Sequence, residues 1–318
     1  MNKTIKTIFT AAGLTAGAAW GLHRALGKLC IDFITAKKMP AAAGLFKSGK
    51  RSGKALPAEH YLDQIETEKV EIVAHDGLKL VGHLQRAEKP KRIIIAVHGW
   101  RASWRINFRY VGEFLHDQGC TVLYIDQRSH GESEGEYKAL GLSERKDCLA
   151  WLDWVNSQNA DHLPIYFYGF SMGATTVLMT SGYGARLKRV KGIIADSGFT
   201  SPKAIMTHVL KRNLKMEYRW FDKYFAKEFH RRTGEPIDSY STLTAMESNT
   251  LPILFIHGEA DDFVPTRMTL ANYNVCTAEK TLVLVPGAGH CLSSAEDPEM
   301  YKDALRTFFK QNDRTWFK

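Results

Sequence analysis

The feature that most constrains the fold of this chain is a regular alternation of strand-like and helix-like stretches from residue 69 onward. The strand-like runs are 70–74, 78–84, 92–97, 121–125, 165–168, 191–195, 252–256 and 281–285. The helix-like stretches are 105–118, 141–157, 173–183 and 298–310. Such alternation predicts an α/β fold, in which a mostly parallel sheet carries helices on both faces. The tight link His75-Asp76-Gly77 predicts that the sheet opens with an antiparallel hairpin.

Residues 199–250 break this alternation, because they contain helical and aromatic stretches but no strand-like run. Within them, Phe221, Phe225 and Phe229 recur at a spacing of four residues, which predicts an amphipathic helix. The segment 203–232 is also strongly basic, with nine basic and three acidic residues. We therefore predict a helical cap inserted over one end of the sheet. Its basic face is either solvated or part of a lid that favours anionic or lipid-surface substrates.

Residues 1–58 differ in composition from the rest of the chain. They hold ten basic residues and one acidic residue, so they carry the whole formal net charge of +9. We therefore divide the chain into a basic N-terminal segment and a globular domain over residues 59–318. A domain without net charge argues against nucleic acid as a partner. The charge of the segment and of the cap points instead to an anionic membrane surface.

Residues 8–22 form an uncharged and mostly apolar run that follows two lysines. The run predicts a membrane anchor or an uncleaved signal-anchor, which would make the protein membrane-associated. Two alternatives stay open: a cleaved secretory signal, which would make the protein secreted, and a helix packed on the globular domain. The basic residues on the two sides of the run are nearly balanced, so they do not indicate which side of the membrane the domain occupies.

The five cysteines are scattered and form no C-x-x-C pair. This pattern predicts neither a disulfide framework nor a zinc site. We expect no metal and no organic cofactor.

A G-x-S-x-G pattern at residues 169–173 stands between a strand-like run and a helix-like stretch. The glycines allow a tight turn and close passage of neighbouring backbone, and the turn pushes the hydroxyl of Ser171 out of the sheet. The helix that follows aims its positive end at the same point. The pattern therefore predicts Ser171 as a nucleophile.

A serine hydroxyl needs a base, and two later strand ends supply candidates in a suitable order. His290 stands in a glycine-rich loop after 281–285, and it would accept the proton of Ser171. Asp261 and Asp262 follow the strand-like run before it, and either could orient the imidazole. Asp196, at the end of a neighbouring strand, is a third candidate for the acid.

Three motifs in this chain resemble the acid loop, the nucleophile elbow and the histidine loop of serine hydrolases in the α/β-hydrolase superfamily. The motifs are HGEADDFVP at 257–265, GFSMG at 169–173 and GAGH at 287–290. The resemblance covers roughly residues 69–310. It is closest to bacterial esterase-like and serine-aminopeptidase-like members, including relatives of feruloyl and cinnamoyl esterases. It implies a triad of Ser171, His290 and Asp261, with Asp261 preferred over Asp262.

An oxyanion hole needs two backbone donors. The amide of Met172, directly after the nucleophile, is one. The resemblance of His98-Gly99-Trp100 to the turns that supply the second donor implicates the amide of Trp100. The expected function is hydrolysis of a small-molecule ester or acyl substrate through an acyl-enzyme. The alternatives are amide or thioester cleavage by the same triad, as in an aminopeptidase, amidase or thioesterase, and a non-catalytic binding protein on the same fold.

Overall fold

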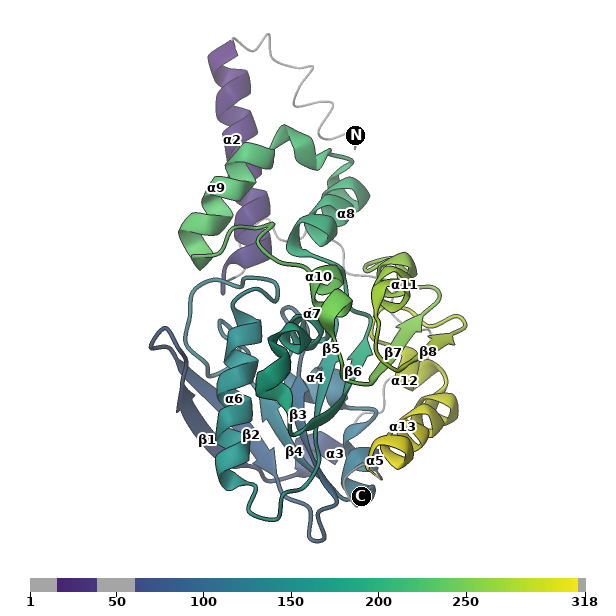
Figure 1. Cartoon of the computed structure of the whole chain (residues 1–318). Coiled ribbons are helices and arrows are strands. Elements are labelled where there is room, and N and C mark those ends of the chain that lie inside the picture. Colours follow the sequence, from purple (N-terminus) through teal and green to yellow (C-terminus); the bar gives the residue numbers. More distant parts are fainter. Residues whose placement is uncertain (1–15, 39–60, 314–318) are drawn as a thin grey trace.

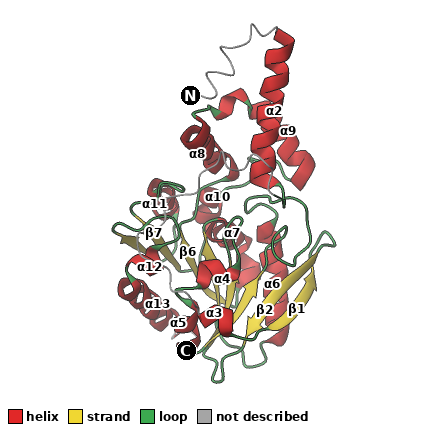
Figure 2. Ribbon diagram, turned by 180° about the vertical axis from the view of Figure 1, so that it is seen from behind, coloured by secondary structure: helices red, strands yellow, loops and turns green. Residues whose placement is uncertain are grey.

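The computed structural model describes residues 16–38 and 61–313, in which helices cover both faces of one central sheet (Figure 1, Figure 2). The strands are β1 (Glu68–Val73), β2 (Lys79–Gln85), β3 (Arg92–Val97), β4 (Cys120–Ile125), β5 (Ile165–Phe170), β6 (Val190–Asp196), β7 (Ile253–Gly258) and β8 (Lys280–Val285). They lie in the order β1-β2-β4-β3-β5-β6-β7-β8. β2 is antiparallel to β1 and β4, and the other neighbouring pairs are parallel. The predicted sheet and its opening hairpin are therefore confirmed.

Two helical layers enclose the sheet. One face is covered by α6 (Glu144–Gln158), α7 (Met172–Thr180), α10 (Thr242–Ser248) and α11 (Thr266–Val275). The other face is covered by α3 (Tyr61–Gln64), α4 (Trp104–Phe108), α5 (Gly112–Asp117) and α13 (Pro298–Asp313), with the short α12 (Ser293–Glu296) before α13. The central strands β3, β4 and β5 are buried along their whole length, as their apolar sequences require.

The prediction of one helix over 105–118 is wrong, because α4 and α5 are separate helices. The break lies next to Gly112, whose backbone passes so close to Leu62 of α3 that a β-carbon would lie 2.6 Å from a leucine methyl group. The predicted helix over 173–183 is also shortened, and the 3-10 helix η2 (Ser181–Leu187) replaces its last turn.

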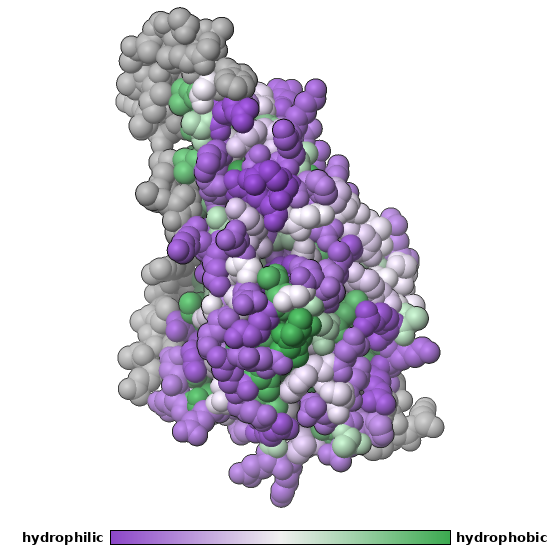
Figure 3. All heavy atoms as spheres, turned by 90° about the vertical axis from the view of Figure 1, so that its left-hand side faces the viewer, coloured by the Kyte–Doolittle hydropathy of each residue, from purple (hydrophilic) through white to green (hydrophobic). Residues whose placement is uncertain are grey.

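Above the carboxyl ends of the strands lie α8 (Pro202–Leu214), η3 (Tyr218–Trp220) and α9 (Asp222–Thr233), which we call the cap (Figure 1). Phe225 and Phe229 of α9 are fully buried, and the neighbouring Phe221 is nearly so. The surface of the cap is largely hydrophilic where Figure 3 shows it. The helix is therefore amphipathic as predicted, with its aromatic face turned inward.

The helix α2 (Ala16–Thr35) lies alongside α9 (Figure 1). The first eight residues of the predicted anchor, 8–15, lie outside the described residues. From Ala16 the helix continues past the apolar run and carries Arg24, Lys28 and Asp32. Over 16–38 and 61–313, no helix combines the length and the hydropathy that a membrane span needs. The predicted transmembrane helix is thus not supported.

Packing explains what the second half of α2 does instead. Its buried side chains, which join a hydrophobic cluster with the cap, are Cys30, Ile31, Phe33 and Ile34. The carboxylate of Asp32 pairs with the buried guanidinium of Arg232 in α9 at 2.6 Å. Of the alternatives for this region, the described part of the helix matches a helix packed on the globular domain.

Candidate active site

Ser171 stands on a sharp turn between β5 and α7. Its backbone has φ 53° and ψ −114°, a conformation that costs a non-glycine residue about 1–3 kcal/mol. The turn is held by the amide of Ser171, which donates to the carbonyl of Asp196 at 2.8 Å. A β-carbon on Gly169 would collide with the backbone of Gly173, and one on Gly173 would collide with the carbonyl of Val97. The two glycines of the motif are therefore required by space.

A continuous chain of hydrogen bonds joins Ser171, His290 and Asp261. The Nε2 of His290 lies 2.9 Å from the Oγ of Ser171, and its Nδ1 lies 2.7 Å from the Oδ2 of Asp261. The other carboxylate oxygen of Asp261 accepts from the amides of Phe263 and Val264, each at 2.9 Å. Asp261 is thus held rigidly behind the imidazole, in a position to fix its tautomer.

The two rival acids lie elsewhere. Asp262 is 42% exposed and pairs with Arg212 of the cap at 3.1 Å. Asp196 is buried and accepts hydrogen bonds from Ser197 at 2.8 Å and Tyr301 at 2.9 Å. Burial raises the pKa of Asp196 to about 6, although these two hydrogen bonds act to lower it. The structure brings only Asp261 of the three candidates to His290.

Neighbouring charges and burial shift the pKa values of His290 and Asp261 in opposite directions. Burial alone would raise the pKa of Asp261, but the charge of His290 and hydrogen bonds from His257 and His290 hold it well below its ordinary value. Burial lowers the pKa of His290, whereas the Cys291 sulfur and the Asp261 carboxylate raise it, and the net shift is upward. The Cys291 sulfur lies 3.5 Å from Nε2. Asp261 therefore stays ionised and stabilises an imidazolium.

His257 is a partner of the acid that the sequence analysis did not assign. Its Nε2 lies 3.0 Å from the Oδ2 of Asp261 and 2.9 Å from the carbonyl of Val264. Because both of these groups are acceptors, Nε2 carries the proton and donates to them. His257 stands four residues before Asp261 in the same motif, and this short spacing was the feature of the sequence from which their contact could have been predicted.

The predicted oxyanion donors flank the nucleophile. Met172 is the first residue of α7, where helix geometry leaves the amide without an intrahelical acceptor. The turn after β3 passes so near that a β-carbon on Gly99 would lie 3.2 Å from the β-carbon of Ser171. The amide of Gly99 donates to Asn107 at 2.6 Å. Among the described residues the amide of Trp100 donates to no acceptor, so it is available to an oxyanion.

Buried histidines support this turn. The amide of Arg101 donates to the Nε2 of His130 at 3.0 Å, and burial holds the pKa of His130 well below its ordinary value. His130 is therefore a neutral acceptor. His98 has a similar role, since its Nε2 accepts from the amide of Gln127 at 3.2 Å and its Nδ1 lies 2.8 Å from the carbonyl of Gly99. These contacts fix the backbone on both sides of Trp100.

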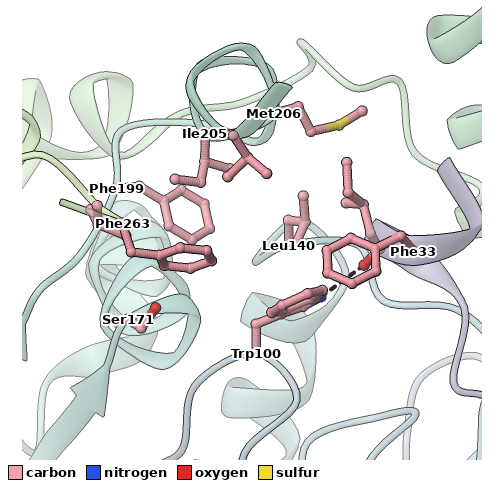
Figure 4. A pocket seen from close by; sticks show the side chains of 11 residues that line it. Phe33, Trp100, Leu140, Ser171, Phe199, Ile205, Met206 and Phe263 are labelled. Atoms are coloured by element: carbon pink, nitrogen blue, oxygen red, sulfur yellow. Dashed lines mark hydrogen bonds between the residues drawn. The ribbon is translucent and has the colours of Figure 1, made fainter. Parts of the chain in front are cut away.

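Ser171 opens into a pocket of about 420 Å³ between the sheet, the cap and α2 (Figure 4). The pocket is lined by Phe33, Ile34, Trp100, Leu140, Ser171, Phe199, Ile205, Met206, Val209, Phe263 and Val264. None of these residues is charged, and Ser171 alone among them presents a hydroxyl. The lining suits an apolar group attached next to the reacting carbon.

Comparison with known proteins identifies the family and the fold of the chain. The sequence pattern of the alpha/beta hydrolase family matches residues 94–304. The uncharacterized protein YqkD of Bacillus subtilis is 28% identical over 259 residues, which are 80% of this chain and 83% of YqkD.

Two solved structures share the fold. The Pyrococcus furiosus esterase Pf2001 has a TM-score of 0.62 at 24% identity, over 83% of this chain and 98% of its own. Est1E from Butyrivibrio proteoclasticus, solved with ferulic acid, has a TM-score of 0.61 at 21% identity, over 76% of this chain and 98% of its own. The two structural neighbours and the strand order show the same fold, and the family match over residues 94–304 shows that the chain belongs to the alpha/beta hydrolase family.

Proposed function

We propose that this protein is a serine hydrolase that cleaves carboxylic esters through an acyl-enzyme intermediate. The observation that carries the proposal is the unbroken chain from Ser171 through His290 to Asp261, placed where an apolar pocket opens. The strained backbone of Ser171 adds support, because a protein that only binds ligands needs no serine held in such a conformation.

The chemistry follows from the position of each group. The Oγ of Ser171 attacks the ester carbonyl while its proton passes to the Nε2 of His290. The carbonyl oxygen becomes an oxyanion and is stabilised by the amides of Met172 and Trp100. His290 then gives the proton to the leaving alcohol, and the acyl group stays on Ser171. A water molecule repeats the sequence, which releases the acid and restores the serine.

The pocket favours esters over the substrates of an aminopeptidase. A free α-amino group is cationic at neutral pH, and binding it in a buried site requires an acidic partner. Among the described residues that line the pocket beside Ser171, none has an acidic side chain. An uncharged acyl group, in contrast, leaves none of the lining residues with an unpaired polar atom. We therefore propose ester cleavage in preference to amide cleavage.

Labelling with a fluorophosphonate tests the proposal without knowledge of the natural substrate. We expect one adduct on Ser171 of the wild-type protein and none on Ser171→Ala. A folded wild-type protein that stays unlabelled, even after addition of detergent to displace the cap, would contradict an activated serine. A panel of uncharged esters, aminoacyl amides and thioesters then separates the reaction classes.

Association with an anionic membrane surface is a second, separate part of the proposal. It rests on the basic residues of 1–58 and of the cap. The test is co-sedimentation of the full chain with neutral vesicles and with vesicles that contain phosphatidylserine. Equal binding to both would remove this part and leave the catalytic proposal untouched.

A further inference from the structure

The pocket at Ser171 is closed on one side by α2, a helix that lies outside the matched region of the family. Phe33 and Ile34, in the last turn of α2, line the pocket together with residues of the loops that follow the central strands and with residues of α8. The match to the family pattern begins only at residue 94. A wall of the candidate active site is therefore supplied by the N-terminal segment.

This wall lies opposite the nucleophile. In Figure 4, Ser171 and Phe263 lie on one side of the pocket, and Phe33 and Trp100 lie on the other. An acyl group bound to the Oγ of Ser171 has its carbonyl carbon at the first side. The far end of its chain must then extend toward α2, where Phe33 and Ile34 limit its length.

The end of α2 is also bound to the turn that carries a predicted oxyanion donor. The indole Nε1 of Trp100 donates to the carbonyl of Ile34 at 2.8 Å. The guanidinium of Arg101 donates to the carbonyls of Phe33 and Ala36, each at 2.9 Å. The last carbonyls of a helix have no intrahelical donor and carry partial negative charge, so these donors satisfy and stabilise them. We call this set of hydrogen bonds the α2 latch.

The segment between β4 and α6 adds two further bonds to the latch. The buried Nζ of Lys138 donates to the carbonyl of Ala36 at 2.8 Å, and the amide of Lys138 donates to the carbonyl of Thr35 at 2.7 Å. The end of α2 is thus fixed by directional bonds on two sides, which a loosely attached segment would lack. Its position relative to the pocket is part of the native structure.

From this arrangement we propose that α2 is part of the active site and that Phe33 and Ile34 determine which acyl chains the enzyme accepts. The inference rests on the proposed esterase function and specifies its substrates as esters of uncharged aliphatic acids.

The test compares two isoleucines of the same helix. Ile34 lines the pocket, whereas Ile31 is fully buried and does not. Each variant, Ile34→Ala and Ile31→Ala, removes the same three carbons, so both weaken the packing of α2 in a similar way. Their kcat/KM values are measured on p-nitrophenyl esters with acyl chains of four to fourteen carbons.

We expect Ile34→Ala to shift the preferred chain toward esters two or three carbons longer, and to raise the preference for long over short chains roughly tenfold. Ile31→Ala should keep the wild-type profile. Phe33→Trp, which adds bulk to the same wall, should shift the preference toward shorter chains. Identical profiles for all variants would overturn the inference, as would equal shifts in Ile34→Ala and Ile31→Ala.

A binding experiment separates this inference from the proposed function, because it needs no turnover. Calorimetry on Ser171→Ala, with and without Ile34→Ala, measures affinity for saturated fatty acids of six to fourteen carbons. If the wild-type protein hydrolyses no ester but Ile34→Ala shifts the preferred fatty acid, the proposed function fails and α2 still sets the chain length. If esters are hydrolysed and neither profile depends on Ile34, the inference alone fails.

Discussion

The two sides of the pocket are built by different means. On the nucleophile side, Ser171 and His290 stand at the carboxyl ends of strands, and short directional bonds and a strained turn hold them. On the opposite side, Phe33 and Ile34 come from a helix that packs on the cap, and they present only apolar atoms to the pocket. The first side is suited to chemistry, in which small displacements are costly, and the second is suited to selection of the substrate.

The strongest test of this division removes the triad and leaves the α2 side intact. In Ser171→Ala and in His290→Ala, we expect kcat on an uncharged ester to fall by roughly 10⁴–10⁶-fold, since triad residues act as a unit. The affinity of Ser171→Ala for a fatty acid should stay near the wild-type value, because that affinity depends on the apolar wall. Wild-type rates in either variant would refute the triad.

The second prediction contrasts two adjacent acids. Asp261→Asn should lower kcat by about 10⁴-fold, because an amide at this position favours the wrong tautomer of His290. Asp262→Asn changes a group that pairs with Arg212 on the cap, and it should change kcat by less than about threefold, as expected for an exposed ion pair. Steady-state kinetics with both variants show which aspartate is the acid of the triad. A larger loss in Asp262→Asn would reverse the assignment.

The difference between the two sides also explains which parts of the structure could be predicted from the sequence. The strands, the turn at Ser171 and the loops that carry Asp261 and His290 were predictable because their signals are local. They consist of apolar runs, glycines at fixed spacing and polar residues directly after strands. Such signals need no knowledge of contacts between distant segments.

The α2 side could not be predicted in this way. The apolar run before residue 22 indicated a membrane anchor, whereas the described helix extends to Thr35 and packs on the cap. The side chain of Trp100 bonds to Ile34, 66 residues earlier in the chain. Such a pairing depends on how the whole chain folds, and no periodicity or spacing encodes it. His257 is an intermediate case, because its position four residues before Asp261 in the sequence was the one indication of their contact.

The third prediction concerns a variant that weakens the attachment of α2 and leaves the triad unchanged. Arg101→Met removes charged hydrogen bonds to the carbonyls of Phe33 and Ala36, and we expect it to destabilise the protein by about 2 kcal/mol. Because the α2 wall then becomes mobile, kcat/KM for long-chain esters should fall several-fold, while that for acetyl esters stays near the wild-type value. Thermal melts and the ester series measure both effects.

Arg105→Met provides a matched control for this variant. Arg105 donates to the carbonyl of Leu62 in α3 rather than to α2. It should therefore lower stability without changing the dependence on chain length. The same chain-length profile in Arg101→Met and Arg105→Met would show that the latch does not position the wall.

The smallest predicted effect concerns the pH dependence of kcat/KM, which is set by groups on the nucleophile side. His290 must be unprotonated to accept the proton of Ser171, so kcat/KM should fall as the pH drops through the pKa of His290. Burial lowers this pKa, but the Cys291 sulfur and the Asp261 carboxylate raise it, and the midpoint should lie above the ordinary histidine value of 6.5. Cys291→Ala removes the sulfur that lies 3.5 Å from Nε2, so the midpoint should move to lower pH.

Cys291→Ala changes the proton affinity of His290 and leaves both walls of the pocket in place. Alanine keeps the β-carbon at the positive φ of residue 291, so the histidine loop is not further strained. The control is Cys276→Ala, a buried cysteine outside the pocket, which should leave the midpoint unchanged. A chain-length preference that stays constant while the midpoint moves would show that chemistry and selection are separable. An unchanged midpoint in Cys291→Ala would mean that the Asp261 carboxylate, and not the sulfur, offsets the effect of burial on the pKa of His290.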